Sequence, residues 1–104
     1  MYCDATYIKC DVDIVSGVYN NGRLALALIN AQNGTPIAKI TTNIPELPLL
    51  EDQIIVKDWS ENEGMLEFLI NNGLVENVEK IIQAGHVFAN VVRVTDKLKN
   101  LIKT

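Results

Sequence analysis

The chain has few of the residues from which catalytic, metal and membrane sites are built. It holds two cysteines and one histidine among 104 residues, and that histidine, His86, has no partner at metal-ligand spacing. Neither of the two common glycine-rich phosphate-binding patterns occurs. No apolar run approaches the roughly 20 residues that cross a bilayer. We therefore expect no enzyme activity, no metal, no cofactor and no membrane span.

Positive charge is also scarce. Nine Lys and Arg stand against 13 Asp and Glu, a formal net charge of −4, which argues against direct binding of nucleic-acid phosphates. Residues 1–4 lack the basic and apolar regions of a signal peptide, so we expect a cytoplasmic protein. The length of 104 residues predicts a single domain over residues 1–104.

The two cysteines do not suggest a disulfide. If residues 3–10 form one extended strand, Cys3 and Cys10 lie about 23 Å apart, at roughly 3.3 Å per residue, and point to opposite faces. We then expect Cys3 in a loose N-terminus and Cys10 as a small apolar strand residue.

The hydrophobic pattern predicts an α+β domain. We expect one curved antiparallel sheet of four to six strands, with one main helix packed on it and a short C-terminal helix. Residues 20–22 (NNG) are a strong hairpin signal, and Pro45 and Pro48 interrupt the sheet. The predicted strands cover residues 7–19, 23–29, 37–42, 53–57, 79–83 and 86–95, and the predicted helices cover residues 60–72 and 97–103.

One segment carries a clear helix-start pattern. Ser60 and Glu63 have the spacing of a capping box, and Trp59 stands where a hydrophobic staple would place it. Glu61 adds negative charge near the positive end of the helix dipole. Gly73 is the expected left-handed residue after the helix. The pattern predicts a helix that begins at Ser60.

Acidic residues are concentrated in the same region. Residues 46–67 contain seven acids and one base, whereas residues 93–103 contain four bases. An acidic face attracts basic grooves that otherwise bind nucleic acid, although such segments also serve as ordinary solubilising faces. Trp59 is either a core residue over the helix start or an exposed interface residue. The predicted partner-binding residues are Glu51, Asp52, Asp58, Trp59, Glu61, Glu63 and Glu67.

Four motifs follow one another along the chain: YNNGRLAL at 19–26, GTPIA at 34–38, NIP at 43–45 and VKDWSENEG at 56–64. Over about residues 15–95 the chain resembles a domain-of-unknown-function family found in Gram-positive bacteria and on their plasmids, phages and conjugative elements. It departs from that family at residues 78–80 and at His86. The resemblance implies no catalytic residue. By analogy it implies a mobile-element protein that inhibits a host defence nuclease complex, of the anti-CRISPR or anti-restriction type.

Two other interpretations stay open at this point. In the first, the chain is a small-molecule or signalling-nucleotide binding module, whose pocket is lined by Asn20, Asn21, Arg23, Asn43 and Trp59. In the second, it is a self-associating regulatory protein, a homodimer formed through an uncovered strand edge or the tail helix.

Overall fold

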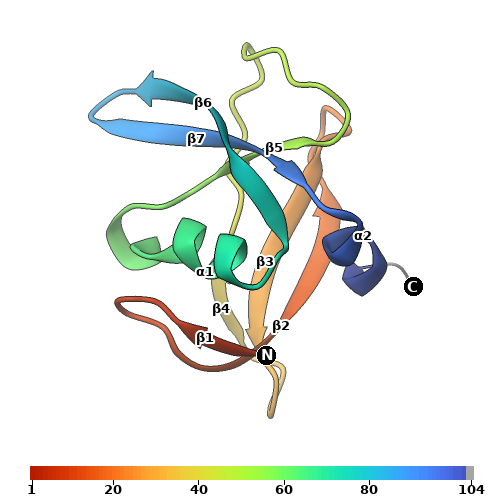
Figure 1. Ribbon diagram of the computed structural model, residues 1–104, viewed down its shortest axis with the longest axis vertical. Helices are drawn as coiled ribbons and strands as arrows, with labels where there is room; N and C mark the ends of the chain where they lie inside the picture. The colour runs from red at the N-terminus through yellow and green to blue at the C-terminus, as the bar shows by residue number, and fades with distance from the viewer. Residues whose placement is uncertain (103–104) are drawn as a thin grey trace.

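Seven strands and two α-helices organise residues 1–102, the part of the chain that the computed structural model describes (Figure 1). The elements are β1 (Tyr2–Asp4), β2 (Lys9–Val18), β3 (Leu24–Asn30), β4 (Pro36–Lys39), β5 (Gln53–Val56), the 3-10 turn η1 (Ser60–Asn62), α1 (Met65–Asn71), β6 (Val75–Ala84), β7 (Val87–Val94) and α2 (Asp96–Ile102). The α+β class is confirmed. Lys103, predicted to end the second helix, lies outside the described residues. No helix within residues 1–102 is long and apolar enough to cross a membrane.

The strands form two antiparallel sheets, not the single sheet of four to six strands that the sequence predicts. The first sheet has the order β1-β2-β3-β4 and the second the order β5-β7-β6. The sheets meet where Thr41, just after β4, lies opposite Val56 of β5. Two backbone hydrogen bonds of 2.8 and 3.0 Å flank this pair. The pairing is short because Pro45 and Pro48 remove backbone donors from the chain that follows.

Strand β1 was not predicted from the sequence, and the expectation that Cys3 lies in a loose N-terminus is wrong, whereas Cys10 is a half-buried residue of β2 as predicted. Cys3 lies opposite Cys10 in the register of β1 and β2, because the chain folds back within residues 5–8, where the Ala5 N–H donates to the Ile8 carbonyl at 3.0 Å. Cys3 is fully buried rather than part of a loose terminus. Residues 5–8 contain no Gly, Pro, Asn or Asp, so the sequence gives no sign of this turn.

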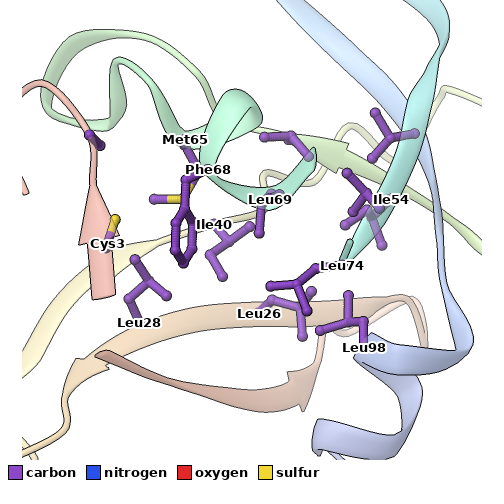
Figure 2. Close-up of a cluster of buried hydrophobic side chains, with 14 of the residues drawn as sticks. Cys3, Leu26, Leu28, Ile40, Ile54, Met65, Phe68, Leu69, Leu74 and Leu98 are labelled. Carbon is purple, nitrogen blue, oxygen red and sulfur yellow. The ribbon is translucent and has the colours of Figure 1, made fainter. Parts of the chain in front are cut away.

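The first sheet, the two helices and one face of the second sheet all contribute buried side chains to the main core. Alternate leucines of β3, including Leu26 and Leu28, point inward because successive strand residues face opposite sides. Figure 2 shows them opposite Phe68 and Leu69 of α1, with Leu98 of α2 beside Leu26. The two helices therefore close one face of the first sheet.

A smaller core forms on the other face of the second sheet. Its buried members are Ile55, Ala89 and Val91. Half-buried apolar side chains pack against them from the loop after β4 and from the segment before η1: Ile44, Leu47, Leu49 and Trp59, together with Ile82 of β6. The loop between β4 and β5 is thus anchored by its own apolar residues.

The helix begins differently from the prediction. Ser60 opens η1 with a φ of +57° and Gly64 has a φ of +92°, so the predicted single helix is split into η1 and α1. Neither start has a side-chain cap at its N-cap residue, and the predicted capping box is wrong. Instead the Asp58 carboxylate accepts a hydrogen bond from the Leu66 N–H at 2.9 Å. The predicted end is confirmed, since Gly73 has a φ of +68°.

Glu79 of β6 joins the three strands of the second sheet and leads to a pH prediction. Its carboxylate accepts hydrogen bonds from Gln53 Nε2 at 2.8 Å and from Arg93 Nε at 3.2 Å. These contacts hold the pKa of the Glu79 carboxyl below its usual range, and the hydrogen bond from Gln53 has the largest effect. We expect Arg93→Gln to raise this pKa in a carbon-13 NMR titration of the carboxyl. An unchanged value contradicts the network.

The same lowered pKa fixes how stability depends on pH. The carboxyl of Glu79 has a lower pKa in the folded than in the unfolded protein. Its contribution to the free energy of unfolding is therefore fully present above the unfolded pKa, roughly 4.3. It is lost as the pH falls through the folded pKa. The wild-type and Arg93→Gln proteins should therefore become more alike in stability under acid.

Candidate functional site

The structure divides the seven predicted binding residues between the two ends of β5. Glu51 and Asp52 come before the strand, and Asp52 forms an ion pair of 3.1 Å with Lys99 of α2. The other five follow the strand, in residues 58–67. The predicted set therefore does not make one continuous acidic face.

Two of the five residues after β5 are half-buried, and their side chains contact other parts of the fold. The Asp58 carboxylate is engaged by the backbone N–H of Leu66 at the start of α1. Trp59 is half-buried and packs against the smaller core. Both side chains thus hold the segment between β5 and α1 in place.

The three glutamates of this segment reach solvent. Glu61, Glu63 and Glu67 are all exposed. Lys57 lies 2.5 Å from Glu61 in an ion pair, and this contact holds the pKa of the Glu61 carboxyl below its usual range. The Glu61 carboxylate is therefore charged at neutral pH, although Lys57 offsets part of its field.

The loop between β1 and β2 is attached to this glutamate-bearing segment. The Thr6 N–H donates to the Glu63 carbonyl at 3.0 Å. A Cβ at Gly64 would lie 3.2 Å from the Cα of Ala5, so only glycine lets the two backbones approach this closely. In Figure 1 the loop lies directly below the coil that precedes α1. The β1–β2 loop and the segment between β5 and α1 thus form one surface.

This contact places two exposed tyrosines beside the glutamates. Tyr7 is 70% exposed and lines a shallow depression with Ser60 and Glu61. Tyr2 is 55% exposed and lines a second depression, of about 250 Å³, with Glu67. Asp4 lines the second depression as well, and it pairs with Lys9. We call this surface the tyrosine–acid face; its residues are Tyr2, Asp4, Tyr7, Glu61, Glu63 and Glu67.

The N-terminal half of the tyrosine–acid face was not predicted from the sequence. Tyr2, Asp4 and Tyr7 are remote in sequence from the glutamates, and only the fold joins them. The signal that could have indicated them is the alternation around Cys3, where an apolar residue stands between two polar ones as in a half-buried strand. An inward Cys3 requires Tyr2 and Asp4 to face outward.

Three of the residues suggested for a small-molecule pocket, Asn21, Arg23 and Asn43, form hydrogen bonds within the protein itself. Asn21 Nδ2 donates to Asn43 Oδ1 at 3.2 Å. Arg23 donates through Nη1 to the Ile44 carbonyl at 2.8 Å and through Nη2 to the Leu47 carbonyl. These groups therefore hold the loop between β4 and β5 over the smaller core.

Replacing Arg23 with alanine should release that loop. The variant loses two hydrogen bonds from a charged donor, which predicts a loss of about 1–3 kcal/mol in the free energy of unfolding. Thermolysin cuts before leucine except where proline follows, so it should then cut faster before Leu49 and Leu50. Arg23→Lys is the matched control, and we expect only partial rescue because a lysine lacks the planar fork. Unchanged cleavage in Arg23→Ala contradicts the anchoring role.

The tyrosine–acid face offers carboxylates, phenols and aromatic surface, which suits recognition. Among residues 1–102, histidine, cysteine and acidic side chains form no group of three or more that could hold a metal ion. Comparisons of the chain with protein-family models, with curated proteins and with solved structures find no match.

Proposed function

We propose that the protein is a non-catalytic binding protein that presents its tyrosine–acid face to a basic protein surface. The observation that carries this proposal is the contact of the β1–β2 loop with the segment before α1, which sets Tyr2 and Tyr7 beside exposed glutamates. Tyrosine is enriched in interfaces because its ring is apolar and its hydroxyl forms hydrogen bonds. Carboxylates around it favour a partner rich in lysine and arginine.

The backbone of the tyrosine–acid face supports binding because it is held in place. The Thr6 N–H is bonded to Glu63 and the Leu66 N–H to Asp58. Little conformational entropy is then lost when a partner binds, which favours affinity. The tyrosines supply contact area. The acids supply electrostatic attraction at a distance, and this attraction weakens as the salt concentration rises.

The partner that we propose is a nucleic-acid-binding complex of a host defence system. A groove built to hold phosphates attracts an acidic protein face by the same charge interaction. The resemblance to small proteins of mobile elements suggests the biological setting. There the protein acts as an anti-CRISPR or anti-restriction inhibitor and keeps nucleic acid out of the groove.

A capture experiment with competition tests this function. Tagged protein is incubated with lysate of a Gram-positive host that carries a defence system, at low and at high salt, and retained proteins are identified by mass spectrometry. We expect a nucleic-acid-binding defence complex that is lost at high salt and is displaced by added duplex DNA. A complex that resists both salt and DNA contradicts the proposal.

Self-association is a second candidate, favoured by the edge of β2. The hydrogen bonds to β3 use alternate residues of β2, so the N–H and C=O groups of Ile14, Ser16 and Val18 point to the opposite edge. Within residues 1–102, the N-terminal strand covers this edge only as far as Val12. A second copy aligned antiparallel around Ser16 would match these groups pairwise.

The native mass decides between a monomer and such a dimer. Under the second candidate, the wild-type protein has the mass of a dimer, and Ser16→Pro, which removes a donor only on the open edge, has the mass of a monomer. Circular dichroism should show the same fold for both. A monomeric wild-type protein rejects self-association through β2.

A further inference from the structure

Two thiols face each other across the hairpin of β1 and β2. Cys3 is directly opposite Cys10, so both side chains lie on the same face of the first sheet. The neighbouring residues Met1 and Val12 exchange both of their backbone hydrogen bonds. Because such pairs alternate along an antiparallel ladder, Cys3 and Cys10 are also a hydrogen-bonded pair, whose Cα atoms lie about 5.5 Å apart. Disulfides span Cα distances of roughly 4.4–6.8 Å.

The two thiols differ in accessibility. Cys3 belongs to the main core and is fully buried (Figure 2), whereas Cys10 is half-buried at its border. Both are free cysteines. Burial raises the pKa of the Cys3 thiol, which disfavours its thiolate. An oxidant therefore reaches Cys10 first, and Cys3 is placed to react second.

We propose that Cys3 and Cys10 are an oxidative modification site that forms a reversible disulfide within the chain. With glutathione disulfide as oxidant, the Cys10 thiolate attacks one sulfur, forms a mixed disulfide and releases one glutathione thiolate. Cys3 then gives its proton to solvent, attacks the Cys10 sulfur and releases the second glutathione. The protein loses two electrons and two protons, and one glutathione disulfide becomes two glutathione thiols.

The disulfide would close a loop that includes part of the tyrosine–acid face. Residues 4–9 lie between the two cysteines and carry Asp4 and Tyr7. Closing this loop restricts the unfolded chain more than the folded one, so the oxidised protein should be the more stable form. The chemistry requires no binding partner, and it stands whether or not the proposed function does.

Oxidation of the purified full chain by glutathione disulfide tests the site. The expected product is a monomer lighter by two hydrogen atoms, without thiols that react with Ellman's reagent. Trypsin cuts after Lys9, so the reduced protein gives separate peptides 1–9 and 10–23, and the oxidised protein gives them joined. Dithiothreitol should restore both thiols and lower the melting temperature again.

Two matched variants complete the test. Cys3→Ser should stop at the mixed disulfide on Cys10, and Cys10→Ser should stay largely unmodified because Cys3 is buried. A wild-type protein that stops at a glutathione adduct overturns the proposal, as does one that forms only disulfides between chains. The wild-type masses decide the question even where a variant folds poorly.

Discussion

Replacing Gly64 with alanine is expected to lower the free energy of unfolding by about 2–4 kcal/mol. Gly64 has a φ of +92°, and an added Cβ would lie 3.2 Å from the Cα of Ala5 and 3.2 Å from the backbone nitrogen of Thr6. Both neighbours are main-chain atoms, and moving them breaks the bond from Thr6 to Glu63. The β1–β2 loop must therefore separate from the segment before α1.

Gly22 provides the matched control for this substitution. Its φ of +83° is nearly the same, but a Cβ there meets nothing within 4 Å. Gly22→Ala should therefore lower the free energy of unfolding by the backbone strain alone, about 1–2 kcal/mol. Urea unfolding followed by circular dichroism measures both variants. Equal losses contradict the close contact at Gly64.

Asn62→Asp is expected to cost more than about 3 kcal/mol at neutral pH. Asn62 is completely buried, and its Nδ2 donates to the carbonyls of Lys39 and Lys57. It thereby ties the end of β4 to the end of β5, where the two sheets meet. Its Oδ1 has no partner among the described residues, so the near-isosteric aspartate removes only the donor and adds charge.

The loss in Asn62→Asp should shrink in acid. A buried carboxylate that faces carbonyl oxygens has a folded pKa above its unfolded value. Its penalty is therefore present above the folded pKa and falls as the pH drops toward the unfolded pKa, since the protonated acid can donate once. Asn77→Asp, at an exposed position of β6, is the control and should change stability by no more than about 0.5 kcal/mol. A pH-independent loss in Asn62→Asp contradicts this explanation.

Local patterns in the sequence predicted most of the strands and both helices. Residues 20–22 form the loop of the β2–β3 hairpin, with Gly22 at a positive φ, as the left-handed position of a three-residue hairpin loop favours. Gly73 ends α1 for the same physical reason. Such residues determine the local backbone conformation through their own φ preferences, so this conformation can be predicted from the sequence alone.

What the sequence could not predict depends on contacts between distant segments. The Ser60–Glu63 spacing fits a capping box, but the approach of Ala5 to Gly64 sets the backbone there, and Asp58 takes over the capping of α1. The contact also assembles the tyrosine–acid face from two remote segments. A periodicity argument describes one element at a time and cannot detect this.

Binding by two charge-matched variants tests whether the tyrosine–acid face is the surface that contacts the partner. Glu61→Gln/Glu63→Gln/Glu67→Gln neutralises three acids of the tyrosine–acid face. The control, Glu46→Gln/Glu51→Gln/Glu76→Gln, neutralises three exposed acids outside that face. Affinity for the captured complex is measured at low salt, with duplex DNA as competitor.

We predict that the first variant loses at least about tenfold in affinity, whereas the control binds like the wild-type protein. Melting temperatures should show that both variants are folded. Equal weakening of the two variants indicates net charge alone and contradicts a specific tyrosine–acid face, as does full binding by the first variant.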